Sequence, residues 1–146
     1  MSNDEVGVNG YVVVVKRDRH TGEVKEKREK KNIVVDDGKE LIASRLRDND
    51  TAPSHIAVGD SSSSTSAGQS ALQGSELKRI AITSTSQNGN ELTYTGDFTG
   101  SWTGTVEEAG IFNASSAGVM LCRFLTGTFD KDSNDEIEVR WTLTIG

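Results

Sequence analysis

The clearest pattern in the chain is a strict alternation of apolar and polar residues near its carboxyl end. Every second residue of the segment 137–145 is apolar: Ile137, Val139, Trp141, Leu143 and Ile145. Charged residues and threonines occupy the positions between them. A two-residue period over nine residues predicts a strand that is buried on one face only.

Similar but shorter patterns predict six to eight strands in total. Runs rich in β-branched residues or alternating residues cover 11–15, 23–35, 55–58, 79–85, 91–98, 106–112, 119–126 and 137–145. The pair Asn88–Gly89 predicts a tight hairpin turn between two of them, of type I′, because this turn needs positive φ angles.

One segment has the spacing of a helix instead. Leu41, Ile42 and Leu46 form a one-sided apolar stripe after the helix-breaking and capping residues around Asp37. The pattern predicts a single short helix over 39–47. The whole chain, 1–146, is therefore expected to be one all-β, mainly antiparallel domain, either a β-sandwich or a barrel-like fold.

Two segments are expected to stand apart from this core. The segment 10–35 resembles a long hairpin whose far part is strongly charged, so we expect an amino-terminal hairpin that protrudes and can be deleted without loss of the fold. The segment 59–70 contains four consecutive serines, which predicts a flexible Ser-rich loop.

Composition and charge exclude several classes of function. The net charge is −6 over 146 residues, which disfavours binding to the phosphates of a nucleic acid. The longest apolar run, 11–15, is too short to cross a membrane, and the first residues lack the pattern of a signal peptide. The single cysteine, Cys122, lies in an apolar run and is expected to be a buried thiol. We expect synthesis and folding in a host cytoplasm.

Catalytic chemistry has little support in the sequence. The chain has two histidines, His20 in a charged turn and His55 at the start of a short strand, and it lacks the G-x-S-x-G pattern of a nucleophile elbow. The simpler interpretation is a surface histidine and a strand-edge histidine. We therefore expect no catalytic residues, no cofactor and no enzymatic activity.

A metal site has only an incomplete motif. Asp130, Asp132 and Asn134 have the opening spacing of a calcium loop, but the sixth position is Asp135 and the twelfth is Trp141, where an EF-hand requires Gly and Glu. These three residues remain candidates for a looser calcium or magnesium site. The alternative is a solvated hairpin loop, since Asp and Asn are common in turns.

The run of basic residues over 25–31 also has two interpretations. Five basic side chains alternate with Glu26 and Glu29, which is typical of a solvated strand that resists unwanted pairing. The alternative is an electrostatic docking ridge for an acidic neighbour.

Several short motifs, in a fixed order, resemble small structural proteins of tailed phages, of the tail or tail-fibre type. They are SHIAVGD at 54–60, a Ser/Thr/Gly-rich loop, ALQGSE at 71–76 with Arg79 nearby, VEEAGIFNA at 106–114, MLCR at 120–123 and VRWTLTI at 139–145. The helix segment 38–46 fits as well, and the opening HIAVG is similar to the amino-terminal part of tail-collar fibre proteins. The resemblance covers roughly 34–146, and the charged hairpin before it departs from the pattern.

The resemblance implies a non-enzymatic component of the virion of a tailed bacteriophage or archaeal virus, without catalytic residues. Its partners would be copies of itself, as a homo-oligomer, and other virion proteins in the tail, baseplate or fibre-attachment region. One alternative is a decoration or turret protein on the surface of the capsid. Another, of a different class, is a glycan-binding module for host attachment, which the low aromatic content of 5% disfavours.

Overall fold

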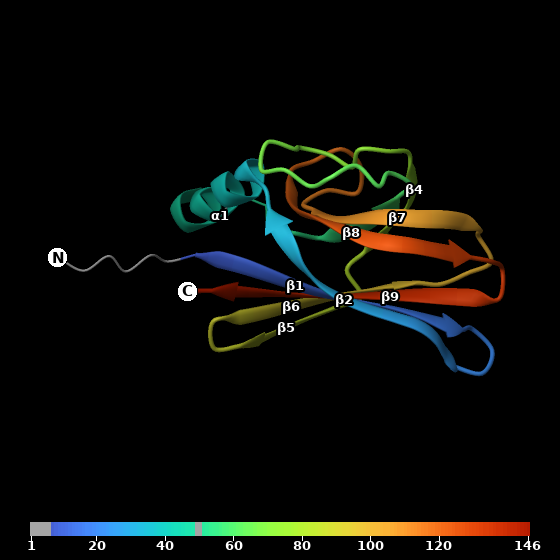
Figure 1. Cartoon of the computed structure of the whole chain (residues 1–146). Coiled ribbons are helices and arrows are strands. Elements are labelled where there is room, and N and C mark those ends of the chain that lie inside the picture. Colours follow the sequence, from blue (N-terminus) through green and yellow to red (C-terminus); the bar gives the residue numbers. More distant parts are fainter. Residues whose placement is uncertain (1–6, 49–50) are drawn as a thin grey trace.

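The computed structural model describes residues 7–48 and 51–146, which form nine strands and one helix (Figure 1). The elements are β1 (Val8–Asp18), β2 (Val24–Val34), α1 (Asp36–Asp48), β3 (His55–Gly59), β4 (Glu76–Ala81), β5 (Ser84–Asn88), β6 (Glu91–Phe98), β7 (Gly104–Phe112), β8 (Met120–Lys131) and β9 (Asp135–Ile145). All strand pairs are antiparallel, in the order β4-β3-β7-β8-β2-β1-β9-β6-β5.

The sheet curls so that its two halves face each other, and β2 is the strand that joins them (Figure 1). Most of β2 pairs with β1, but its last residues, Ile33 and Val34, pair with Arg123 and Cys122 of β8. The space between the halves is filled by apolar side chains from both. The all-β, single-sheet, barrel-like fold with one short helix confirms the fold class expected from the sequence.

The core follows the alternation seen in the sequence. The side chains of Ile137, Val139, Trp141 and Leu143 on β9 are buried, and the Trp141 ring packs edge-to-face on Phe124 with ring centroids 6.2 Å apart. Edge-to-face contact is a preferred geometry for aromatic pairs. The last member of the pattern, Ile145, is 39% exposed because it lies at the rim of a surface pocket.

The predicted strand 79–85 is wrong as a single element. The chain forms β4 on one half of the sheet, and β5 then pairs with β6 on the other half. The change of direction takes place at Ile82 and Thr83, whose amides donate to the carbonyls of Ser54 (2.8 Å) and Thr95 (2.7 Å). These bonds hold the two halves together at the corner opposite β2.

The predicted hairpin between β5 and β6 is confirmed, with Asn88 paired to Glu91 across a two-residue turn. The turn type differs from the expectation. Of the two turn residues only Gly89 has a positive φ, of 60°, whereas a type I′ turn needs positive φ at both positions. A positive φ at the first position alone fits type II′.

The amino-terminal hairpin is part of the sheet for most of its length. Every residue of β1 pairs with β9, from Val8 with Ile145 to Asp18 with Asp135. Only the turn after Asp18 and the free edge of β2 can extend away from the core, as the sequence predicted for the whole hairpin. The expectation that residues 10–31 can be deleted is corrected, because the deletion would remove the buried side chains of Val12 and Val14.

Candidate functional site

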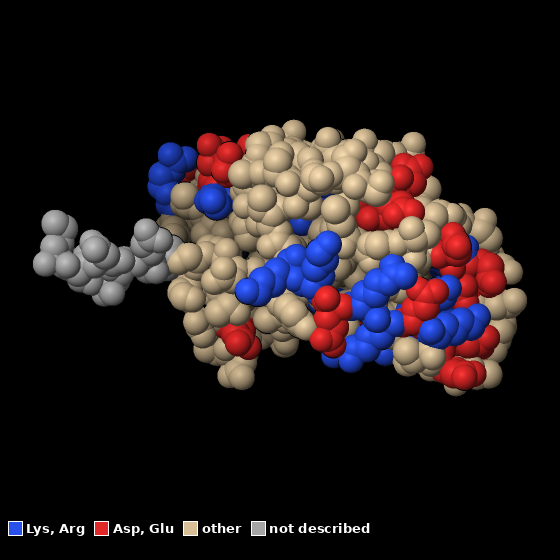
Figure 2. Space-filling model, viewed as in Figure 1, with Lys and Arg blue, Asp and Glu red and all other residues tan. Residues whose placement is uncertain are grey.

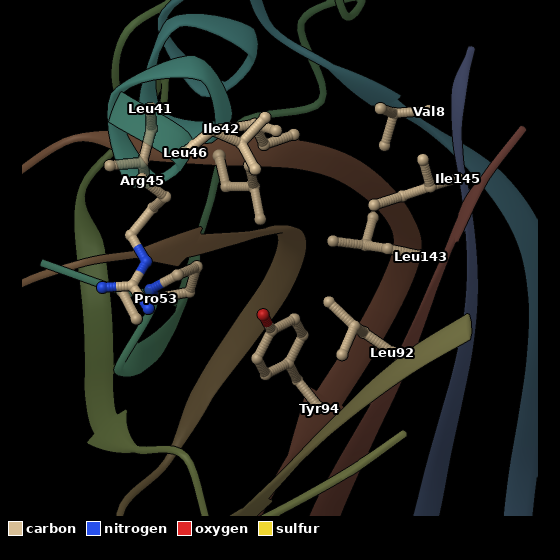
Figure 3. A pocket seen from close by; sticks show the side chains of 12 residues that line it. Val8, Leu41, Ile42, Arg45, Leu46, Pro53, Leu92, Tyr94, Leu143 and Ile145 are labelled. Carbon is tan, nitrogen blue, oxygen red and sulfur yellow. The ribbon is translucent and has the colours of Figure 1, made fainter. Parts of the chain in front are cut away.

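An apolar pocket of the described chain lies between helix α1 and the adjacent ends of β1, β6 and β9 (Figure 3). Its volume is about 310 Å³. The residues that line it are Val8, Leu41, Ile42, Arg45, Leu46, Ala52, Pro53, Leu92, Tyr94, Leu121, Leu143 and Ile145. This volume and this lining are in the range of ordinary small-molecule or side-chain pockets.

The pocket results from the way in which α1 packs on β8. Gly38 lies so close to the backbone of Leu121 that a Cβ atom would collide with the Leu121 carbonyl. The close approach buries Leu41, while Leu46, five residues further along the helix and on a different face, is left 87% exposed. Two of the four large apolar side chains with high exposure in the described chain, Leu46 and Ile145, lie at this pocket.

Two polar groups accompany the apolar lining. In Figure 3 the hydroxyl of Tyr94 points toward the helix, and the side chain of Arg45 descends from α1 beside Pro53. Burial raises the pKa of the Tyr94 hydroxyl, and nearby Cys122 raises it further while Arg45 opposes the shift. The hydroxyl therefore stays protonated at neutral pH and can only serve as a neutral hydrogen-bonding group. The pocket can bind an apolar group, but it contains no acid–base pair.

A second candidate surface is formed by strand edges that lack a partner among the described residues. β4 and β5 end the sheet on either side, and β2 pairs with β8 only at its last two residues. Charged side chains lie along β2 and β4, which is a common protection of edges against unwanted pairing. The five residues of β5 are all exposed, and none is charged or proline.

The basic ridge predicted at 25–31 is largely neutralised within the chain. Lys25 pairs with Asp135 (Nζ to Oδ1, 2.5 Å), and Lys27 and Arg28 pair with glutamates on the same strand. Within residues 7–48 and 51–146, no ion pair involves Lys30 or Lys31. Figure 2 shows the resulting mixture of positive and negative side chains over the β1–β2 end of the molecule.

Arg28 closes the gap between the two halves of the sheet. Its guanidinium donates to the carbonyl of Thr126 (3.2 Å) and lies 4.4 Å from the centre of the Phe129 ring. Gly127 has a φ of 68°, and a Cβ atom at this position would collide with Arg28. One of the five basic residues therefore has a structural role that the sequence pattern did not indicate.

The histidines lie where the sequence placed them. His20 is exposed in the turn after β1. His55 begins β3, and its Nδ1 lies 2.7 Å from the hydroxyl oxygen of Ser54. In the part of the chain that the structure describes, no carboxylate hydrogen-bonds to His55, so the third member of a hydrolytic triad is missing there.

The candidate metal ligands lie in and before the β8–β9 turn, and the two carboxylates each accept a hydrogen bond. Asp130 accepts from the Thr105 hydroxyl (2.9 Å), and Asp132 accepts from the backbone amide of Asn134 (2.8 Å). Across the two described ranges, no three carboxylate, imidazole or thiol groups come together as a metal site would require. A site at Asp130, Asp132 and Asn134 stays a prediction.

The same turn is more buried than a solvated loop. Asp135 is only 2% exposed and accepts from Lys25 and from the Asp132 amide. The ammonium of Lys131 donates to the carbonyls of Gly100 (2.9 Å) and Trp102 (2.7 Å) and lies over the Trp102 ring. Burial lowers the pKa of Lys131. Lys131 therefore fixes the β8–β9 hairpin against the loop before β7, and Asp135 fixes it against Lys25 of β2.

The most buried polar cluster was missed by the sequence analysis. Glu108 on β7 and Arg123 on β8 are both fully buried and form an ion pair, with Arg123 Nε 2.9 Å from Glu108 Oε1. Glu108 also accepts from three backbone amides, those of Ser61, Gln73 and Gly74, and Arg123 donates to the carbonyl of Ser63 (2.8 Å). A signal was present for Arg123, which is the single charge in the apolar run 119–125, whereas Glu108 follows another glutamate, Glu107.

This ion pair anchors the Ser-rich segment that the sequence predicted to be a flexible loop. The backbone on both sides of residues 61–74 is tied to buried side chains, and Gln69 also contacts Arg123 (3.2 Å). The flexibility of 59–70 stays a prediction, and these anchors oppose it. A charged pair with all its partners in place can specify one loop conformation.

Comparison with known proteins gives no match: no protein-family model, no curated protein and no solved structure is similar to the chain. Among the described residues there is also no helix with the length and apolar content that a membrane span needs.

Proposed function

We propose that the chain is a non-enzymatic structural component of a tailed virus particle, from the tail, baseplate or fibre-attachment region. It acts by associating with copies of itself and with neighbouring virion proteins. The proposal starts from the resemblance of the ordered motifs in 34–146 to small tail or tail-fibre proteins. In the alternative, a capsid decoration or turret protein, the chain would associate in the same way but on the head of the particle.

The observation that carries the proposal is the set of open strand edges. β2, β4 and β5 each have one side without a strand partner over most or all of their length in the described chain. An open edge presents unpaired amide and carbonyl groups, which another chain can extend into a larger sheet. For a protein that assembles with its neighbours, an edge of this kind that lacks charged side chains, as β5 does, can serve as a docking site.

The interior supports a structural role as well. The buried Glu108–Arg123 pair and the Lys131 contacts fix loops, and their partners are main-chain carbonyls and amides. The hollow that Arg123 lines has a volume of only about 30 Å³, which is far smaller than a ligand pocket. Their physical effect is a rigid domain, which is what a repeated subunit of an assembly needs.

The glycan-binding alternative has less support. Sugar sites commonly offer an exposed aromatic face, and Tyr11, at 43%, is the only strongly exposed aromatic residue in the described chain. The ring of Trp102 is covered on one side by Lys131. Tyr11 also holds Glu29 through its hydroxyl (2.5 Å), which ties this side chain to β2.

The first test is the mass of the purified protein in solution, measured by size-exclusion chromatography with light scattering. A closed oligomer would support the assembly role, and its copy number would point to a tail or a capsid vertex. A second measurement asks whether gradient-purified particles contain the chain, by mass spectrometry, and where an antibody binds them. Absence from intact particles would refute the proposal, and labelling of the head would favour the capsid alternative.

A further inference from the structure

We infer that β5 is a self-association edge, at which two copies of this chain pair their β5 strands antiparallel about a two-fold axis at Ser86. The inference rests on the proposed assembly role and names its partner, a second copy of the chain. The paired strands would join two nine-stranded sheets into one continuous sheet.

The open edges differ in how they are protected. β2 carries Lys27, Lys30 and Lys31, and its Arg28 reaches across to β8. β4 carries Lys78 and Arg79, and Arg79 donates to the carbonyls of a neighbouring loop. Lysines and long charged side chains are the usual means by which proteins prevent edge pairing. β5 has none of them, since its sequence is Ser-Thr-Ser-Gln-Asn.

The composition of β5 allows it to pair with its own copy without electrostatic conflict. In an antiparallel self-pair centred on Ser86, Ser84 would face Asn88 of the second copy and Thr85 would face Gln87. No charged residue would face another charge. In the same arrangement centred on Arg28 of β2, Arg28 would face its own copy and Lys25 would face Lys31, and like charges directly opposite each other are destabilising in a sheet, although Lys27 would face Glu29.

The hydrogen-bonding pattern shows which backbone groups are free. Asn88 and Glu91 flank a two-residue turn, so they form a hydrogen-bonded pair, and the alternation of the ladder makes Ser86 with Thr93 another such pair. The amide of Ile145 donates to the carbonyl of Asn90 (3.1 Å), which agrees with Glu91 facing β5. The groups that point outward are therefore those of Thr85 and Gln87.

This geometry fixes the register of the proposed pair. Thr85 of each copy would exchange hydrogen bonds with Gln87 of the other, and the two Ser86 residues would form a non-hydrogen-bonded pair at the two-fold axis. Cα atoms in such a pair lie about 4.5 Å apart. The side chains of both copies would be on the same face of the joined sheet, beside the Thr93–Thr142 row of β6 and β9.

A five-residue edge buries less surface than a stable dimer needs, which is about 1,200 Å² or more. The association is therefore weak in dilute solution and becomes effective when copies are held close together on a particle. For this reason the test traps the pair by a disulfide. The chain suits this test because its own thiol, Cys122, is fully buried, and burial raises the pKa of that thiol far above its ordinary value.

The experiment compares two single variants of the full chain, Ser86→Cys and Ser84→Cys. Both positions are exposed, on the same strand and on the same face. In the proposed register, the two introduced thiols at position 86 meet within disulfide range, about 4.4–6.8 Å between Cα atoms. The two at position 84 lie about 14 Å apart, because four residues along a strand separate them. We expect at least about tenfold more cross-linked dimer from Ser86→Cys under mild oxidation.

Equal cross-linking of the two variants would overturn the inference, and so would no cross-linking of Ser86→Cys at millimolar protein. A charge exchange gives an independent check. Ser86→Lys or Ser86→Glu alone should abolish self-association, and an equal mixture of the two should restore it. If each variant associates as the unchanged chain does, β5 is not the edge in use.

The outcomes also separate this inference from the proposed function. If the chain is found in particles but Ser86→Lys is incorporated normally and Ser86→Cys does not cross-link, the β5 pair is wrong and the assembly role stands. If Ser86→Cys cross-links selectively but the chain is absent from particles, the β5 pair stands and the virion role is wrong.

Discussion

Replacing Glu108 by Gln should destabilise the fold by about 3–5 kcal/mol, the usual cost of breaking a buried ion pair by removing one charge. Glu108 and Arg123 are both 0% exposed, so no solvent can compensate the remaining charge. Glutamine has nearly the same volume, so the substitution leaves no cavity. The destabilisation would come from the lost charge and from the hydrogen bonds that an amide cannot make.

The hydrogen bonds give a similar magnitude. One carboxylate oxygen accepts from Arg123 Nε (2.9 Å) and the Gln73 amide (2.8 Å), and the other accepts from the amides of Ser61 (2.9 Å) and Gly74 (2.9 Å). Whichever way a glutamine amide is oriented, its nitrogen faces two donors. Two buried donors without an acceptor cost about 1–3 kcal/mol each.

Thermal and urea denaturation measure this effect directly. For a domain of this size, 1 kcal/mol corresponds to about 2–4 °C in Tm, so Glu108→Gln should lower Tm by about 6–20 °C. The matched control is Glu107→Gln, on the same strand, where the carboxylate accepts from the Thr128 hydroxyl at the surface (2.8 Å). This control should change stability by less than about 0.5–1 kcal/mol.

A local measurement tests the assigned role of the pair in holding the Ser-rich segment. Hydrogen exchange of the amides of Ser61, Gln73 and Gly74 should accelerate in Glu108→Gln under conditions where the rest of the chain stays folded. If Glu108→Gln is as stable as Glu107→Gln and these amides exchange at their former rate, the buried pair does not anchor the loop, and the reasoning is wrong.

Three further predictions follow from single contacts. Gly127→Ala should destabilise the domain by about 1–3 kcal/mol in urea denaturation, because a residue with a Cβ atom is strained at the φ of 68° and the guanidinium end of Arg28 must also move, whereas Gly68→Ala, in open space, should be near neutral. Gly38→Ala should loosen α1 from β8, seen as lower Tm together with faster exchange of the helix amides, since the new Cβ meets backbone atoms. Burial raises the pKa of the Asp135 carboxyl, but hydrogen bonds from Lys25 and a backbone amide outweigh it and place the pKa below its ordinary value of 3.8. This contribution to stability is present above that value and is lost as the pH falls through the lower pKa of the folded state. Denaturation between pH 2 and 5 should therefore show a weaker pH dependence for Asp135→Asn, and an unchanged profile would contradict this assignment.

Much of the local structure could be predicted from the sequence because it depends on periodicity and on the chemistry of turns. The alternation at 137–145 fixed which residues of β9 face the core, and the Asn88–Gly89 pair located the β5–β6 hairpin. The helix was found at nearly its observed position, since an apolar stripe with acidic residues before it and basic residues at its end is a local signal.

The arrangement of these elements depended on contacts between distant residues, which local patterns do not contain. A single predicted strand at 79–85 became two strands because Ile82 and Thr83 bond to residues of different halves of the sheet. The charged hairpin became an inner part of the sheet because β9 pairs along the whole of β1. Which strand edges stay open follows only from this topology.

The buried polar groups show the same division. The sequence placed Glu108 and Arg123 in predicted strands but gave no reason for their charges. Each of the two charges compensates the other across the β7–β8 pair, and residues of the distant segment 61–74 supply the remaining hydrogen bonds. The sequence by itself determined which side chains can leave water. Only the tertiary structure decided which of the buried polar side chains have partners. Such partners are required because an unpaired buried charge costs more free energy than local folding can supply.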